Sequence, residues 1–139
     1  MTNTTDKPRT RIISLTGRPP VRIREDDWPI IAEGKWDRYD GKTYSQANRT
    51  WSIGIRVRQN QHDGRAIVYG VYDYDSSFAG EPSELRRAGV LVEPGGHIAI
   101  AIERVCQQLI DRISDREMFH HARCVADECT SKLPAQNLD

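Results

Sequence analysis

The sequence feature that most constrains the fold is a strand pattern that turns back on itself. Apolar side chains recur at every second position from residue 51 to residue 57, with polar or small residues between them. That period of two is typical of a half-buried β-strand. Residues 60–64 (Asn-Gln-His-Asp-Gly) favour a turn, and residues 65–74 are rich in β-branched and aromatic side chains. The pattern predicts an antiparallel hairpin at the centre of the chain.

Shorter strand patterns lie on either side of this hairpin. Residues 11–16 predict a first strand and residues 21–23 alternate like a short edge strand, and a stretch containing glycine and two prolines separates them. Residues 88–92 are apolar and end at a Pro-Gly-Gly sequence. The sequence therefore predicts one or two further strands in addition to the hairpin.

Three helices are expected. Residues 26–34 predict a short one, because two aspartates precede a proline in the first turn and a glycine ends the run. Apolar side chains at helical spacing predict a long helix over residues 98–113. The Ser-Asp-Arg-Glu sequence at 114–117 has the capping-box pattern and predicts a final helix.

Strands grouped before helices indicate the α+β class. We predict an antiparallel sheet of three to four strands around the central hairpin, packed on one face by the long C-terminal helix. A short N-terminal helix and a final helix complete this architecture. A chain of 139 residues suits one domain, which we expect over residues 11–130, with flexible tails at 1–10 and 131–139.

Charge is balanced over the whole chain but unevenly distributed. There are 20 basic and 20 acidic residues, so the net charge is zero. A general nucleic-acid binder usually carries a net basic field, and zero net charge counts against that class without excluding a local patch. The first 24 residues hold six basic residues and one acidic residue. Such segregation can steer a partner towards one surface.

The number of cysteines and the distribution of apolar residues indicate the cellular location that we expect. The three cysteines are an odd number and do not form the framework of a secreted disulfide-rich protein. No apolar stretch reaches the roughly 18 residues that a membrane helix requires. The N-terminal sequence lacks the apolar segment of a signal peptide. We therefore expect a cytoplasmic protein that has no membrane partner.

One face of the central hairpin is a candidate binding surface. If Gln59 pairs with Arg65, two guanidinium groups lie at one end of this face and two phenols at the other, with facing glycines between them. An acidic protein surface or a nucleic acid could bind there. The alternative is a solvated face, or one that the Arg-rich N-terminal segment covers. The candidate residues are Arg56, Arg58, Gly54, Gly70, Tyr72 and Tyr74.

A second candidate is a histidine and cysteine group in the final helix. His120 and Cys124 are four residues apart and share a helical face, with His121 beside them. Cys129 falls on the apolar stripe instead. Two good ligands are fewer than the four of a structural zinc site, so we predict no metal and no cofactor.

Four residues near the N-terminus bear a weak likeness to a nuclease element. Asp26, Asp27, Glu33 and Lys35 have the residue types of the carboxylate-and-lysine element of metal-dependent nucleases. That chemistry needs the groups to converge from a strand hairpin, whereas a helix end is expected here. We therefore predict no catalytic residues and no enzyme. A small metal-dependent hydrolase or nuclease remains an alternative.

Several segments together carry a resemblance to other proteins. They are Thr-Gly-Arg-Pro-Pro-Val-Arg-Ile at 16–23, Trp-Pro-Ile-Ile-Ala at 28–32, and the hairpin residues between 56 and 70. In these segments the chain resembles a group of short proteobacterial proteins associated with plasmids, prophages and integrative elements. The resemblance implies no activity. Genes in such neighbourhoods often encode accessory or anti-defence proteins.

These observations lead to one functional hypothesis and two alternatives. We expect a non-enzymatic binding module, of the accessory or anti-defence type that mobile elements carry, which acts through the Arg56 and Arg58 face. The alternatives are the hydrolase or nuclease described above and a homodimer that pairs through its sheet.

Overall fold

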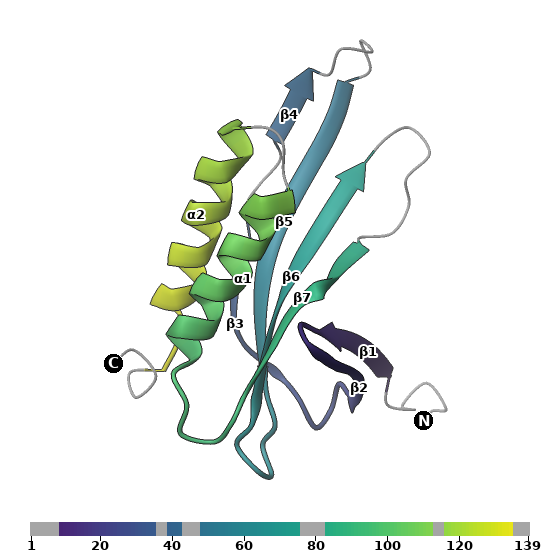
Figure 1. Ribbon diagram of the computed structural model, residues 1–139, viewed down its shortest axis with the longest axis vertical. Coiled ribbons are helices and arrows are strands. Elements are labelled where there is room, and N and C mark those ends of the chain that lie inside the picture. Colours follow the sequence, from purple (N-terminus) through teal and green to yellow (C-terminus); the bar gives the residue numbers. More distant parts are fainter. Residues whose placement is uncertain (1–8, 36–38, 43–47, 76–82, 113–115, 135–139) are drawn as a thin grey trace, which may run out of the picture.

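The computed structural model describes residues 9–35, 39–42, 48–75, 83–112 and 116–134. Over these residues the chain forms seven strands followed by two helices (Figure 1). The elements are β1 (Thr10–Leu15), β2 (Arg18–Arg24), β3 (Ile30–Lys35), β4 (Tyr39–Lys42), β5 (Asn48–Gln59), β6 (Ala66–Asp75), β7 (Ser83–Val92), α1 (Ile98–Arg112) and α2 (Arg116–Ser131).

The strands form one mixed sheet in the order β2-β1-β7-β6-β5-β3, and β4 also pairs with β5. Neighbouring strands are antiparallel except β1 and β7, which are parallel and meet at the single pair Leu15 and Gly89. β3 and β4 pair with successive stretches of β5, so the long central strand has a partner along most of its length.

The central hairpin forms as β5 and β6, but the expected register is wrong by one residue. Gln59 pairs with Ala66, not with Arg65. The amide of Asn60 donates to the carbonyl of Arg65 at 2.8 Å, so these two residues close the turn. The side-chain oxygen of Asn60 accepts hydrogen bonds from the amides of His62 and Asp63, at 2.7 and 3.0 Å. This local side-chain bonding stabilises a turn whose register differs by one residue, so each β6 side chain lies on the opposite face of the sheet from the one expected.

The predicted architecture is wrong in two further respects. The sheet has more strands than the three to four expected, and the short N-terminal helix does not form. The amides of Asp27 and Trp28 donate back to the carbonyl of Arg24, at 3.0 and 3.2 Å, and make a tight turn. β3 then begins at Ile30, where two consecutive β-branched residues favour a strand and β5 supplies the partner.

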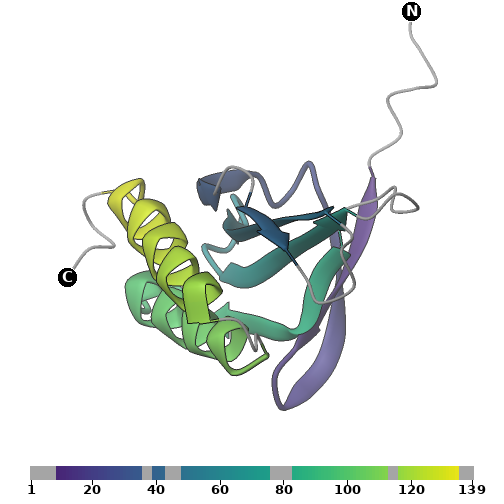
Figure 2. The same ribbon diagram turned by 90° about the horizontal axis from the view of Figure 1, so that it is seen from above.

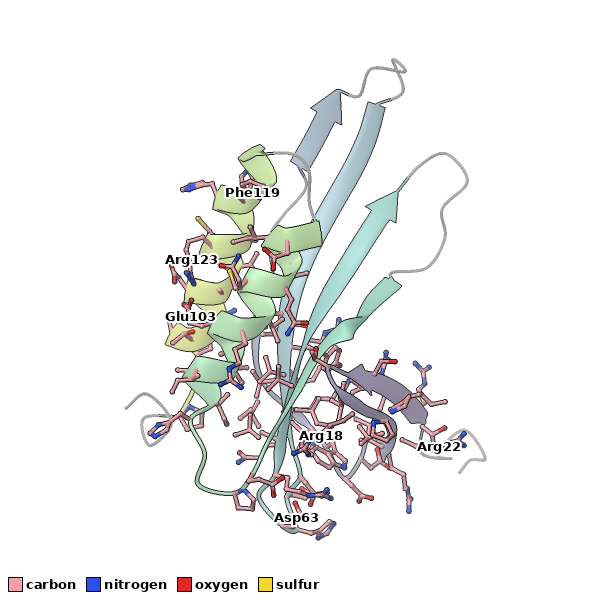
Figure 3. The ribbon with its side chains drawn as sticks, in the orientation of Figure 1. Arg18, Arg22, Asp63, Glu103, Phe119 and Arg123 are labelled. Carbon is pink, nitrogen blue, oxygen red and sulfur yellow. The ribbon has the colours of Figure 1, made fainter. Side chains whose placement is uncertain are left out.

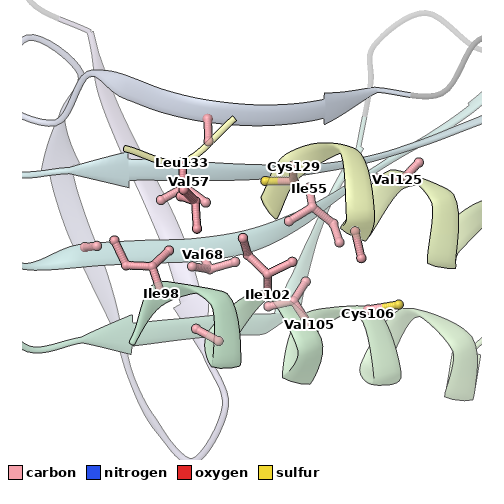
Figure 4. Packing of buried hydrophobic residues seen from close by; sticks show 14 of the residues in the cluster. Ile55, Val57, Val68, Ile98, Ile102, Val105, Cys106, Val125, Cys129 and Leu133 are labelled. Carbon is pink, nitrogen blue, oxygen red and sulfur yellow. The ribbon is translucent and has the colours of Figure 1, made fainter. Parts of the chain in front are cut away.

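Two helices, and not one long helix, cover the sheet. α1 packs over β6 and β7, whereas α2 packs over β3 and β5 (Figure 2). Between helices and sheet lies the larger core, shown in Figure 4. Leu133, which we expected in the C-terminal tail, is buried in this core. The fully buried members include Ile55, Val57, Val68, Ile98, Ile102, Val105 and Leu109.

The opposite face of the sheet is covered by the β1–β2 hairpin. Ile67 and Tyr69 point to this face, because they alternate along β6 with the residues that face the helices. They pack in a smaller buried cluster with residues from the N-terminal segment, namely Ile13, Leu15, Ile23 and Trp28. The β6 and β7 part of the sheet therefore lies between the helices on one side and the β1–β2 hairpin, which is the other end of the same sheet, on the other.

Candidate functional site

Arg58, one of the two arginines of the predicted binding face, lies inside the fold. Its side chain is only 7% exposed. Nε donates to the hydroxyl of Tyr69 at 2.8 Å, and Nη1 donates to the carbonyl of Trp28 at 2.9 Å. Nη2 lies 3.7 Å from a carboxylate oxygen of Glu25. This guanidinium is already engaged within the protein and cannot serve a partner without breaking those contacts.

Arg56 lies on the same face and is bound to Glu33 of β3. Partial burial by itself lowers the pKa of Arg56, but the hydrogen bond and the negative charge of Glu33 outweigh it, so the pKa is raised overall. Arg56 is therefore a fixed cation that joins β5 to the edge strand β3.

The glycines and tyrosines of the predicted face do not form the expected platform. Gly70 faces α1, where a Cβ atom would stand 3.0 Å from the Leu109 side chain. Gly54 pairs with Val71 and not with Gly70, so the two glycines do not face one another. The side chains of Tyr72 and Tyr74 lie outside the described part of the structure. In the observed register Ile67 and Tyr69, which we expected on the core face, lie on the face that the N-terminal segment covers.

The nuclease-like residues do not converge where the structure describes them. Glu33 binds Arg56, while Asp27 lies 3.5 Å from the ring of His62 in the β5–β6 turn. Asp26 is exposed, and the side chain of Lys35 lies outside the description. Across the described ranges, no three His, Cys, Asp or Glu side chains are grouped so as to hold a metal ion.

The His120 and Cys124 pair forms on α2 as the helical spacing predicted. The Cys124 sulfur lies 3.6 Å from Nε2 of His120, and both residues are exposed. Cys129 points instead into the core, where burial raises the pKa of its thiol to about 12. This arrangement keeps Cys129 protonated and separate from the pair.

A basic surface that the strand analysis missed lies on the outside of the β1–β2 hairpin. Between residues 9 and 24 there are five arginines and no acidic residue. In β2, Val21 and Ile23 point inwards, whereas Arg22 and Arg24 point outwards. Figure 3 shows Arg22 on the side of the molecule away from the helices. We define the basic face as the exposed arginines of this hairpin, with Arg22 and Arg24 on its outer side and Arg9 and Arg18 at its ends.

Most of the basic face has no counter-charge among the residues that the structure describes. Arg24 lies 4.0 Å from Asp27, with its side chain 57% exposed. Arg9, Arg18 and Arg22 make no ion pair with any residue that the structure describes. Arg11, the remaining arginine of the segment, points inwards and pairs with Glu25 at 2.8 Å. The charge run was visible in the sequence, and alternation along 21–24 could have assigned Arg22 and Arg24 to the outer side.

The hairpin is held rigidly against the sheet from several sides. The amide of Thr16 donates to the carbonyl of Gly89 at 2.9 Å, and its hydroxyl donates to Gln108 of α1 at 2.9 Å. A Cβ atom on Gly89 would stand 2.4 Å from the carbonyl oxygen of Ser14, so β1 and β7 approach more closely than a larger residue permits. The outer arginines are therefore carried on an ordered ribbon.

The fold and the site together define an α+β protein in which two helices cover one face of a mixed sheet and a basic hairpin, formed by the end of that sheet, covers part of the other face. The chain matches no protein-family model, no curated protein and no solved structure. Neither of the helices in the described ranges has the length and apolar character needed to cross a membrane.

Proposed function

We propose that this protein is a non-enzymatic binding module, and that the basic face of the β1–β2 hairpin captures an acidic macromolecule. The observation that supports the proposal is the row of exposed arginines along a segment that contains no carboxylate. This surface replaces the Arg56 and Arg58 face, because those two side chains already have partners within the fold.

Arginine is the residue type best suited to this role. Its guanidinium is planar, always charged and able to bind phosphate or carboxylate through two parallel hydrogen bonds. A charge held on an ordered strand also loses less conformational entropy on binding than one on a loose tail. The rigid attachment of the hairpin therefore favours capture of an anionic partner.

The same proposal includes a reducing, cytoplasmic location. Cys106, Cys124 and Cys129 are all free thiols, which is the usual state in that compartment. The association with mobile elements that the sequence resemblance implies stays a prediction.

Retention on immobilised heparin, a general polyanion, tests the proposed function. We expect the protein to be retained at low salt and pH 7, although its net charge is zero. Arg22→Glu should elute at clearly lower salt, because it reverses one charge of the basic face. The matched control is Arg104→Glu on α1, which also reverses one exposed arginine. Equal elution of the two variants would contradict the proposal.

A further inference from the structure

We propose that the acidic partner is double-stranded DNA, which the outer face of the β1–β2 ribbon contacts from the major groove. This inference rests on the proposed function and specifies the chemistry of the partner. Three features of the ribbon support it: the spacing of its arginines, the residue types between them, and its shape.

The spacing of the outer arginines suits a phosphate backbone. Arg22 and Arg24 are alternate residues on one side of β2. A strand rises about 3.3 Å per residue, so their Cα atoms are roughly 7 Å apart. Each DNA strand carries one phosphate per about 3.4 Å of helix axis, so this separation corresponds to two nucleotides. Arg18 pairs with the buried Leu15 after a register shift in the hairpin, so it lies at the turn end and not in this row.

The absence of aromatic residues favours a duplex over a single strand. Proteins that bind single strands stack bases on exposed aromatic rings, which contributes about 1–3 kcal/mol per base. Residues 9–24 contain no Phe, Tyr or Trp. The aromatic residues packed against the inside of the hairpin, Trp28 and Tyr69, are buried. The bases of a single strand would therefore have no aromatic side chain of residues 9–24 to stack on, whereas contacts to the backbone of a duplex do not require stacking.

The shape of the ribbon favours DNA over RNA. The major groove of B-form DNA is about 12 Å wide and admits a two-stranded β-ribbon. The corresponding groove of A-form RNA is too narrow for side chains to read. On the outer face, Ile12 lies opposite Arg22 and is 50% exposed. An apolar side chain between arginines can contact a thymine methyl group, which only DNA presents in that groove.

The small number of arginines sets the expected strength of binding. If three or four phosphates are neutralised, the logarithm of the affinity should fall with the logarithm of salt concentration at a slope of about −3 to −4. That slope is shallow for a DNA-binding protein, as befits a chain with zero net charge. Binding should consequently be weak at physiological salt and readily measured at low salt.

Fluorescence anisotropy with labelled nucleic acids tests the inference. The probes are a short DNA duplex, one of its strands alone, and the RNA duplex of the same sequence, with polyglutamate as an unlabelled competitor. We expect the DNA duplex to bind at least fivefold more tightly than either other nucleic acid. Arg22→Ala should weaken duplex binding about tenfold and make the salt slope shallower by about one. Arg104→Ala should leave both quantities unchanged.

The possible results separate this inference from the proposed function. Equal or tighter binding of the single strand or of the RNA duplex would overturn the choice of DNA. A third result would overturn the inference and leave the acidic-partner function standing. In it, the protein is retained on heparin through Arg22 and is eluted from heparin by polyglutamate, but does not bind the DNA duplex. Loss of both heparin and DNA binding would remove both. Circular dichroism of each variant confirms that an exposed substitution has not altered the fold.

Discussion

Arg58 joins the central β5–β6 hairpin to the N-terminal segment of the chain. Its guanidinium contacts Tyr69 of β6, the carbonyl of Trp28 and the carboxylate of Glu25. Glu25 in turn holds Arg11 of β1. One buried cation thus connects both strands of the central hairpin to the N-terminal segment.

We expect Arg58→Ala to lower the free energy of unfolding by about 3 kcal/mol or more. The substitution leaves a buried hydroxyl, a carbonyl and part of a carboxylate without their partner, and removing one member of a buried ion pair typically has a cost of this size. Urea denaturation measures the change. Arg104→Ala, at an exposed position on α1, should change the same quantity by less than about 0.5 kcal/mol. Similar small changes in both variants would show that the contacts of Arg58 contribute little.

Cys129 predicts how stability depends on alkaline pH. Burial raises the pKa of its thiol from an ordinary value of 9.0 to about 12. The folded protein therefore binds this proton more tightly than the unfolded chain does. The stability that the group contributes is complete below about pH 9 and is lost as pH rises towards 12.

Urea denaturation at about pH 8 and about pH 10.5 should show this loss. In Cys129→Ala the thiol is gone, so this variant should be less stable at the lower pH but lose less stability on going to the higher one. Parallel losses in the two proteins would mean that Cys129 does not stay protonated in the core.

At the scale of elements, a single glycine determines how α2 packs on the sheet. A Cβ atom at Gly34 of β3 would stand 2.1 Å from the carbonyl oxygen of Val125 and 3.0 Å from the amide nitrogen of Cys129. Both neighbours are helix backbone and cannot rotate aside. Gly34 is therefore where the helix axis comes closest to the edge strand, and Lys132 adds a hydrogen bond from its ammonium to the carbonyl of Glu33 at 3.0 Å.

Gly34→Ala should push α2 away from β3 and destabilise the protein by about 3 kcal/mol, at the upper end of the usual range for overpacking. Gly17→Ala is the control, because Gly17 has no atom within 4 Å of its Cβ position but has a φ of 72°. That variant should lose only about 1 kcal/mol, from the left-handed backbone alone. Thermal unfolding followed by circular dichroism compares the two. A smaller loss for Gly34→Ala than for Gly17→Ala would contradict the close packing.

Helices and strands were predicted correctly where one hydrophobic periodicity extended over several helical turns or several residue pairs of a strand ladder. The apolar stripe that includes Ile102 and Leu109 is buried in α1, as its spacing indicated. The prediction of a helix over residues 26–34 was wrong, because two aspartates and an early proline also suit a turn that leads into a strand. Only pairing with β5 decides between the helix and the strand. The β6 part of the candidate site was wrong because the turn hydrogen bonds of Asn60 go with a hairpin register shifted by one residue, and the β5 part was wrong because Arg56 and Arg58 have partners within the fold. Periodicity carries no information on such a shift.

At the scale of the whole molecule, the zero net charge conceals a strong separation of charge. Residues 9–24 carry five arginines and no acid, a charge of +5. Residues 1–8 hold one lysine and one aspartate, which cancel. The remaining residues, 25–139, contain 14 basic and 19 acidic residues and so carry 14 − 19 = −5. The protein is therefore a basic hairpin on an acidic body.

Separated charges of this kind should make copies of the protein attract one another at low salt. The basic face of one molecule faces the acidic body of the next, and no net charge opposes their approach at neutral pH. Static light scattering should give a negative second virial coefficient at low ionic strength. The coefficient should rise as salt shortens the Debye length to about 8 Å near 0.15 M.

Two variants separate the effect of net charge from that of charge separation. Arg22→Glu and Arg104→Glu each bring the net charge to −2. The first reduces the charge of the hairpin to +3, whereas the second takes the charge of the body to −7. The attraction should therefore weaken markedly in Arg22→Glu and persist in Arg104→Glu. If both variants lost it equally, net charge alone would govern the interaction, and the hairpin would have no special part in how this molecule meets its partners.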